Sequence, residues 1–225
     1  MLSPPICHIS DTHIKGRAWD NADVEQKLML IRSKLPDNGT LVCTGDLVQG
    51  GKRRQFAQMY ELFKPFAGNL VLAPGNHDYG SFGIFNSFIS RWRWGRVCSK
   101  LNTISGEHRG YYFEVLDTCF AWWSLFKLAR GRVTKWMRNN IKKTRENTKL
   151  PILICMHHDP KNEKPELLLE GADEFNEVVQ GRALAVLYGH SHRKAILNAE
   201  HPYLPLYHSA DNLRDNDWRY EDSLV

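Results

Sequence analysis

The sequence has no long apolar run, no repeat and no tract of low complexity. A membrane-spanning helix needs about 20 consecutive apolar residues, and no segment of the chain approaches that length. Residues 1–5 also lack the basic stretch followed by an apolar stretch that marks a secretory leader. We therefore expect a cytoplasmic protein that has no membrane partner.

Cysteine is scarce, and its arrangement excludes two kinds of structure. The chain has 5 cysteines, an odd number, and none of them forms a C-x-x-C pair. This argues against a disulfide framework and against a structural zinc site, and it fits a reducing compartment. The net charge of +5 over 225 residues is compatible with an anionic substrate. Nucleic-acid-binding proteins often have a stronger basic stripe.

The order of apolar segments predicts one α/β domain over residues 1–225. Short apolar runs alternate with segments of helical period, which is typical of layered α/β domains. Strands are expected at 6–10, 40–43, 70–73, 111–116, 151–156, 184–188 and 203–207, and helices at 23–35 and 53–66. Residues 80–109 mix glycine, aromatic residues and arginine, and we interpret them as a small cap or specificity insertion. The polar stretch 211–225 is interpreted as a loose tail.

Metal-binding residue types follow five of the expected strands. The five segments are Asp11-Thr12-His13, Gly45-Asp46, Gly75-Asn76-His77-Asp78, His157-His158 and Gly189-His190-Ser191-His192. Ligands bind at the strand ends of layered α/β domains, and aspartate and histidine are unfavourable to bury unless they are paired or coordinated. The five segments therefore predict one shared centre.

The residue types in these segments indicate which metals the centre would hold. Imidazole nitrogens mixed with carboxylate and amide oxygens suit Mn, Fe or Zn better than Ca or Mg, which prefer oxygen ligands alone. Asp11 and His13 are separated by one residue, as are His190 and His192. In an extended segment such pairs place their side chains on one face, so both could reach one metal centre.

Read in chain order, the motifs D-x-H, G-D, G-N-H-D, H and G-H-x-H resemble the calcineurin-like metallophosphoesterase superfamily. The resemblance extends from Asp11 to His192. It implies a four-layer α-β-β-α sandwich with two mixed β-sheets, and a metal-dependent hydrolase of phosphoric esters. It also implies two metal ions, with a hydroxide between them that attacks phosphorus.

The resemblance further implies a role for each matching residue. One metal would be held by Asp11, His13 and His192. The other would be held by Asn76, His157 and His190, and Asp46 would bridge the two. His77 would lie near the leaving group, supported by Asp78. The glycines Gly45, Gly75 and Gly189 would let the backbone turn sharply and bring the next side chain to the metals.

Three further residues are candidates for contact with substrate: Arg91, Arg93 and His158. The segment Arg91-Trp92-Arg93-Trp94-Gly95-Arg96 could stack bases and pair with phosphates. Its alternative is an amphipathic strand or helix end whose arginines are simply solvated. His158 follows a candidate ligand, and the alternative to a site role is packing or a nearby hydrogen bond.

Departures from subfamily patterns narrow the substrate. The segment after Gly45 reads G-D-L-V-Q-G-G and lacks the aspartate and arginine of the G-D-x-V-D-R-G motif of Ser/Thr protein phosphatases. The chain most resembles compact bacterial cyclic-nucleotide phosphodiesterases, which implies a small phosphodiester substrate. The alternatives are a nuclease acting on DNA or RNA, a phosphomonoesterase, and a non-catalytic metal-binding scaffold. The oligomeric state stays open.

Overall fold

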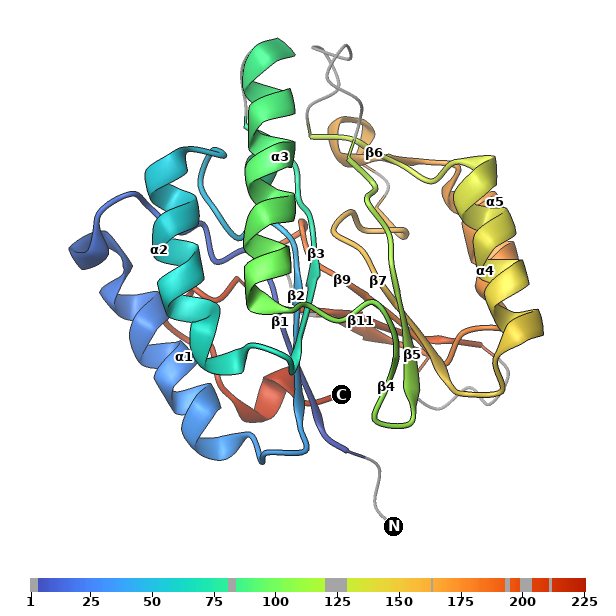
Figure 1. Ribbon diagram of the computed structural model, residues 1–225. Helices are drawn as coiled ribbons and strands as arrows, with labels where there is room; N and C mark the ends of the chain where they lie inside the picture. The colour runs from blue at the N-terminus through green and yellow to red at the C-terminus, as the bar shows by residue number, and fades with distance from the viewer. Residues whose placement is uncertain are drawn as a thin grey trace.

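Two β-sheets lie face to face at the centre of the molecule, and helices cover their outer faces (Figure 1). The computed structural model describes residues 4–80, 84–119, 129–162, 164–192, 195–198, 204–210 and 212–225. The layers run helix, sheet, sheet, helix. The four-layer α/β fold is therefore confirmed.

The smaller sheet contains three parallel strands, β1 (Ile6–Ile9), β2 (Thr40–Thr44) and β3 (Leu70–Ala73). All three strands are buried on both faces, which explains their nearly continuous apolar sequences. Alternate residues of these strands point to opposite faces of the sheet and pack into different hydrophobic cores. Cys43 packs among the helices, whereas its neighbour Val42 packs against the other sheet.

The larger sheet has six strands in the order β10-β11-β9-β7-β5-β4 and is mixed. Its strands are β4 (Gly106–His108), β5 (Tyr111–Val115), β7 (Ile152–Cys155), β9 (Ala185–Tyr188), β10 (Ala195–Leu197) and β11 (Leu206–Ser209). The β4 and β10 strands are antiparallel to their neighbours, and the central strands are parallel. The strand expected at 203–207 is found as β11. Residue 203 lies outside the described residues.

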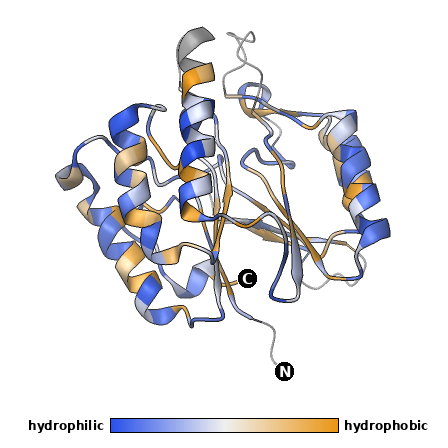
Figure 2. Ribbon diagram, viewed as in Figure 1, coloured by the Kyte–Doolittle hydropathy of each residue, from blue (hydrophilic) through white to orange (hydrophobic). Residues whose placement is uncertain are grey.

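The outer helices turn apolar faces toward the sheets and polar faces toward solvent (Figure 2). The smaller sheet is covered by α1 (Ala22–Lys34), α2 (Arg53–Phe63) and α3 (Ile84–Leu101), and the larger one by α4 (Lys135–Asn147) and α5 (Ala172–Val179). Two short strands, β6 (Gly131–Arg132) and β8 (Leu169–Glu170), pair in parallel and form a separate small sheet. In the ranges given above, no helix has the length and apolar character needed to span a bilayer.

The segment interpreted as a cap or insertion contains the 18-residue helix α3. Trp94, Val97 and Leu101 of α3 are buried in the core of the first layer, beside α2. Glycine and three arginines interrupt the apolar period of this helix, which is why its sequence did not predict it. Residues 81–83 of the segment lie outside the described part of the chain.

The C-terminal stretch is docked, which differs from the loose tail that its polarity suggested. Leu213, Trp218 and Tyr220 are buried in the core of the first layer. The Val225 N–H donates to the Ile6 carbonyl at 3.0 Å, and Leu224 forms a bridge with Cys7 of β1. A few large apolar side chains spaced among charged residues are therefore enough to anchor this segment.

Candidate metal centre

The predicted ligands converge from loops at the ends of strands of both sheets. Three groups of side chains each place one ligand atom per residue within 4.8 Å of the others. The groups are Asp11, His13 and His192; His13, Asp46 and His77; and Asp46, His157 and His190. All six of the predicted aspartate and histidine ligands are therefore brought together, along with His77.

The backbone at this centre is strained. Five of the candidate ligands have a left-handed backbone: Asp11 (φ 55°), His13 (φ 41°), Asp46 (φ 51°), His190 (φ 68°) and His192 (φ 51°). Residues other than glycine rarely adopt this conformation, and each instance costs about 1–3 kcal/mol. We expected extended segments from the D-x-H and H-x-H spacing, and this prediction was wrong. Sharp local turns aim the alternate side chains instead.

All three predicted glycines permit close approach of the loops; at Gly75 a Cβ atom would overlap the carboxylate and the backbone nitrogen of Asp46. Gly45 has φ 93°, and a Cβ atom there would overlap the ring of His157. At Gly189 a Cβ atom would overlap the hydroxyl of Ser10 and the carboxylate of Asp11. Of the three, Gly45 alone has the unusual backbone angle that a sharp turn was predicted to need. Gly75 and Gly189 are required because a Cβ atom would not fit.

Asp46 occupies the middle of the cluster. Its Oδ2 atom lies 3.3 Å from His157 Nε2 and 4.0 Å from both His13 Nε2 and His77 Nε2. Its Oδ1 atom accepts a hydrogen bond from the His77 backbone N–H at 2.9 Å. One carboxylate oxygen thus faces histidines of both flanking groups, as a bridging ligand must.

Pairs of ligand atoms are spaced as they would be around one ion. Two atoms that each lie about 2.1 Å from a metal, at angles of 90–110°, are about 3.0–3.4 Å apart. His192 Nε2 lies 3.1 Å from Asp11 Oδ1, and His190 Nδ1 lies 3.1 Å from His157 Nε2. The observed spacing therefore suits a cation between these atoms.

Hydrogen bonding also leaves an acceptor atom without a donor. The Thr44 carbonyl can only accept, so its 2.7 Å contact with His157 Nδ1 places a proton there and turns Nε2 inward. Within the described part of the chain, Asn76 Oδ1 is buried and has no hydrogen-bond partner. Buried polar atoms are normally satisfied, and a metal ion would satisfy this oxygen.

The electrostatics of the cluster favour positive charge at His157, beside Asp46. Burial opposes charge on Asp46, but the charge of His157 and a hydrogen bond from it outweigh burial, and the pKa of Asp46 is lowered. Burial likewise opposes charge on His157, yet Asp46 raises its pKa to about 9. Burial and the nearby His157 lower the pKa of His190 to about 4. The pair of Asp46 and His157 therefore favours a positive charge on the imidazole, whereas His190 favours its neutral form.

Asp78 does not support His77 in the way that the resemblance implied. Its two carboxylate oxygens accept the backbone N–H groups of Val48 and Gly75, each at 2.8 Å. Burial, followed by the charge of Asp46, raises the pKa of Asp78 to about 8. The His77 ring is oriented instead by its Nδ1 contact with the Gln49 carbonyl at 3.0 Å. A backbone partner of this kind leaves no signal in the sequence.

Two of the three candidate substrate contacts are committed to structural interactions. Arg91 Nη1 lies 2.6 Å from Asp117 Oδ2, and its guanidinium lies 3.7 Å over the Tyr79 ring. His158 is fully buried, and its Nδ1 is 2.8 Å from the Thr118 hydroxyl. The packing alternative therefore describes His158 better than contact with substrate.

The third candidate, Arg93, lies on the other side of α3 from Arg91. Its Nη1 atom donates to the Gly51 carbonyl at 3.0 Å. Gly51 follows the loop that carries Asp46 and Gln49. Arg93 therefore contacts a loop of the centre without belonging to the cluster of ligands.

Arg214 supports the first loop of the centre, and sequence reasoning missed it. Its guanidinium donates to the carbonyls of Thr12 at 2.9 Å and His13 at 3.1 Å, and to Asn21 Oδ1 at 2.9 Å. About 200 residues separate Arg214 from this loop, and no local pattern joins them. The docked C-terminal stretch thus holds the loop that presents Asp11 and His13.

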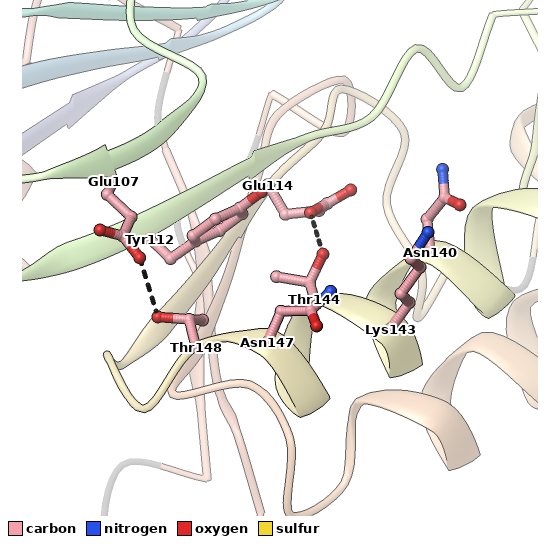
Figure 3. Close-up of a pocket in the computed structure, with 8 residues that line it drawn as sticks. All are labelled: Glu107, Tyr112, Glu114, Asn140, Lys143, Thr144, Asn147 and Thr148. Atoms are coloured by element: carbon pink, nitrogen blue, oxygen red, sulfur yellow. Dashed lines mark hydrogen bonds between the residues drawn. The ribbon is translucent and has the colours of Figure 1, made fainter.

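A separate polar depression lies between β5 and α4 and has a volume of about 320 Å³ (Figure 3). Both of its carboxylates are engaged: Glu107 accepts from the Thr148 hydroxyl at 3.2 Å, and Glu114 accepts from the Thr144 hydroxyl at 2.9 Å. None of the predicted site residues lines this depression. The chemistry therefore belongs to the strand-end cluster.

Comparison with known proteins agrees with the geometry. The family profile described as calcineurin-like phosphoesterase matches residues 4–194. A 3',5'-cyclic adenosine monophosphate phosphodiesterase, CpdA, from Haemophilus influenzae is 24% identical over 180 residues, 77% of this chain and 61% of that protein. A cAMP/cGMP dual specificity phosphodiesterase from Mycobacterium tuberculosis is 33% identical over 84 residues, 32% of this chain and 26% of that protein.

A solved structure extends the likeness to nearly the whole fold. The phosphopantetheinyl hydrolase of Mycobacterium tuberculosis superimposes with a TM-score of 0.59 and 13% identity, covering 99% of this chain and 95% of that one. At this identity the likeness concerns the fold alone. The two curated phosphodiesterases are matched over less than two thirds of their own lengths.

Proposed function

Because this chain belongs to the calcineurin-like phosphoesterase family, and is therefore a metal-dependent phosphoric ester hydrolase, we propose that it cleaves a phosphodiester at a centre of two metal ions. The observation that carries this proposal is the position of Asp46, which lies between two groups of ligand-type side chains. A single structural ion would need only one of those groups.

The ligand atoms fit two ions of Mn, Fe or Zn. Asp11, His13 and His192 would hold one ion, and Asn76, His157 and His190 the other, with Asp46 shared. The unsatisfied Asn76 oxygen and the close approach of His190 to His157 support the second set. When bound, two such ions supply the positive charge that acidifies a water and stabilises the phosphoryl oxygens.

His77 has the exposure and orientation of a group that meets the substrate. About a third of its side chain is exposed, at 31%, whereas the Asp46 side chain is nearly covered. The Gln49 carbonyl holds Nδ1, so the ring presents Nε2 toward Asp46 and the reacting centre. Because Nδ1 donates to the Gln49 carbonyl, Nε2 carries a proton only in the imidazolium form of the ring; in that form Nε2–H can protonate the leaving oxygen or hydrogen-bond to a phosphoryl oxygen.

A small phosphodiester of the cyclic-nucleotide type is the substrate that we propose. The two curated relatives named above support it, since both are phosphodiesterases of cyclic nucleotides. The test is hydrolysis of bis-p-nitrophenyl phosphate beside p-nitrophenyl phosphate by manganese-loaded protein, with Asp46→Asn as the control. Faster diester hydrolysis that disappears in the variant supports the proposal, and cyclic nucleotides are then assayed directly.

The other outcomes of that assay identify the alternatives. Faster hydrolysis of the monoester would make the protein a phosphomonoesterase. No metal-dependent hydrolysis of either ester, together with bound metal, would indicate a scaffold and would contradict the proposal. A nuclease is the second candidate, because a basic and aromatic groove lies beside α3.

A further inference from the structure

A groove of about 670 Å³ runs between α2 and α3, outside the cluster of metal-type ligands. The two helices lie side by side in Figure 1 and form the outer surface of the first layer. The groove is lined mainly by Arg53, Phe56, Tyr60, Trp92, Arg96 and Lys100. The groove thus combines cations with aromatic rings over an apolar floor.

Basic side chains outnumber acidic ones in this groove: Arg53, Arg93, Arg96 and Lys100 line it, with Glu61 as the one acidic lining residue. Arg53, Arg96 and Lys100 are exposed, and none of them forms an ion pair within the described ranges of the chain. Arg96 and Lys100 are four residues apart on α3, where like charges destabilise a helix. Arg53 begins α2, at the helix end that favours negative charge. An anionic ligand would relieve both conflicts.

The rings of Trp92 and Tyr60 line the groove, and Trp92 is the more exposed of the two. Trp92 is 56% exposed, and the Arg96 guanidinium lies 4.8 Å from its ring centre. Lys100 Nζ lies 5.6 Å from the ring centre of Tyr60 on the facing helix. Phe88, one turn before Trp92 on α3, is 71% exposed. Exposed rings next to cations are the arrangement that holds planar bases and their phosphates.

The groove is joined to the metal centre by its surrounding loops. Arg93, which also lines the groove, donates to the Gly51 carbonyl, two residues after the Gln49 carbonyl that orients His77. The basic residues Lys52, Arg53 and Arg54 follow directly. The stem of Arg54 packs beside Gly16, three residues after His13. Basic residues therefore continue from the groove toward the first loop of the centre.

From these contacts we propose that the groove between α2 and α3 binds single-stranded nucleic acid. The phosphates lie against Arg53, Arg96 and Lys100, and bases stack on Trp92 and Tyr60. A flexible single strand fits a hollow of this size, and its bases are free to stack. An anionic membrane instead suits a helix that exposes one apolar face, whereas these cations line a concave surface. Binding here goes beyond the proposed hydrolysis and does not require turnover.

The experiment measures binding without catalysis. Fluorescence anisotropy follows the full chain titrated onto a labelled oligodeoxynucleotide of about 12 nucleotides, in EDTA, at several salt concentrations. The test variant is Arg96→Glu/Lys100→Glu. Its matched control is Lys142→Glu/Lys143→Glu, which makes the same change in net charge on α4, on the opposite side of the molecule. A third variant, Trp92→Ala, removes the principal stacking surface.

Binding by the unaltered protein with a log–log salt slope of about −0.7 per phosphate contact is expected. The α3 double variant should lose at least about tenfold in affinity and flatten the slope by about 1.4, because two contacts are lost. The α4 control should bind as the unaltered protein does. Trp92→Ala should weaken binding roughly tenfold without changing the slope.

Three results would overturn the inference. The first is an absence of binding by the unaltered protein at low salt. The second is an equal loss in both double variants, which would show a response to net charge alone. The third is binding to vesicles of anionic phospholipid but not to the oligonucleotide. Melting temperatures of all variants confirm folding, and a failure of ester hydrolysis leaves this measurement unaffected.

Discussion

His77 and Asp46 occupy different environments at the centre, and we propose different roles for them. The Asp46 side chain is nearly covered and faces histidines of both flanking groups, whereas His77 is partly exposed at the rim. Both depend on backbone groups for their orientation: Asp46 accepts from the His77 N–H, and His77 contacts the Gln49 carbonyl. The proposed roles in metal binding and proton transfer can therefore be tested separately by substitution.

We expect His77→Ala to lower kcat on a diester by a factor of about 10² to 10⁴, the usual contribution of a positioned acid or base. The metal content should stay near that of the unaltered protein, because the other candidate ligands remain in place. Steady-state kinetics and elemental analysis of the same preparation measure both quantities. An equal loss of metal and activity would show that His77 is a ligand and not a proton donor.

Gly189→Ala should reduce both metal content and activity, because the added Cβ overlaps Ser10 and Asp11 and displaces the loop of His190 and His192. The expected loss of stability is about 1–3 kcal/mol, as for overpacking in a core. Gly95→Ala is the matched control, since nothing lies within 4 Å of a Cβ there, and helix propensity predicts slight stabilisation. Full metal content in Gly189→Ala would contradict the requirement for space.

At the scale of elements, α3 is held in place by contacts on two sides. Trp94 and Leu101 pack into the core of the first layer, and Arg91 forms an ion pair with Asp117, which follows β5. Tyr79 lies two residues after His77, and its hydroxyl donates a hydrogen bond to Asp117 at 3.0 Å. The position of α3 therefore bears directly on the segment that presents His77.

The C-terminal stretch is the second element that acts on the centre from a distance. We expect Arg214→Ala to weaken metal binding roughly tenfold, because the variant removes the guanidinium that holds the carbonyls of Thr12 and His13. Equilibrium titration with manganese measures the change. Arg219→Ala, an exposed residue of the same stretch, should bind metal normally. Unchanged affinity in Arg214→Ala would show that the loop keeps its strained turns without support.

For the whole molecule, the protonation of buried groups at the centre affects both the stability of the metal-free fold and the proposed binding of metal. The pKa of His157 is raised from 6.5 to about 9, so its stabilisation of the metal-free fold is complete below pH 6.5 and is lost toward pH 9. The pKa of Asp78 is raised from 3.8 to about 8, and its contribution is lost in the same direction. The metal-free protein should therefore become less stable between pH 6.5 and about 9.

Bound metal should show the opposite dependence on pH. A metal ion needs His157 without its inward proton, so affinity rises as that proton is lost, and ligand binding stabilises the folded state. The difference in melting temperature between manganese-loaded and chelated protein should therefore widen from pH 6.5 toward 9. Thermal unfolding in matched buffers measures it. A constant or shrinking difference would contradict the assignment of His157 as a ligand.

The sequence by itself determined the layered α/β fold and the set of candidate ligands. Strand and helix periods are local, and the metal-type residues follow the strands directly, so both can be read along the chain. Asp11, Asp46, His157 and His190 were predicted to share a centre and lie together in the structure. Their roles as ligands stay a prediction.

Only the tertiary structure decided which contacts orient these residues. The left-handed turns at Asp11 and His13, the Gln49 carbonyl behind His77, and the reach of Arg214 to Thr12 depend on segments far apart in the chain. The same holds for the groove, whose cations and rings come from two helices. Side-chain pairing across such distances follows from packing, and packing leaves no local period in the sequence.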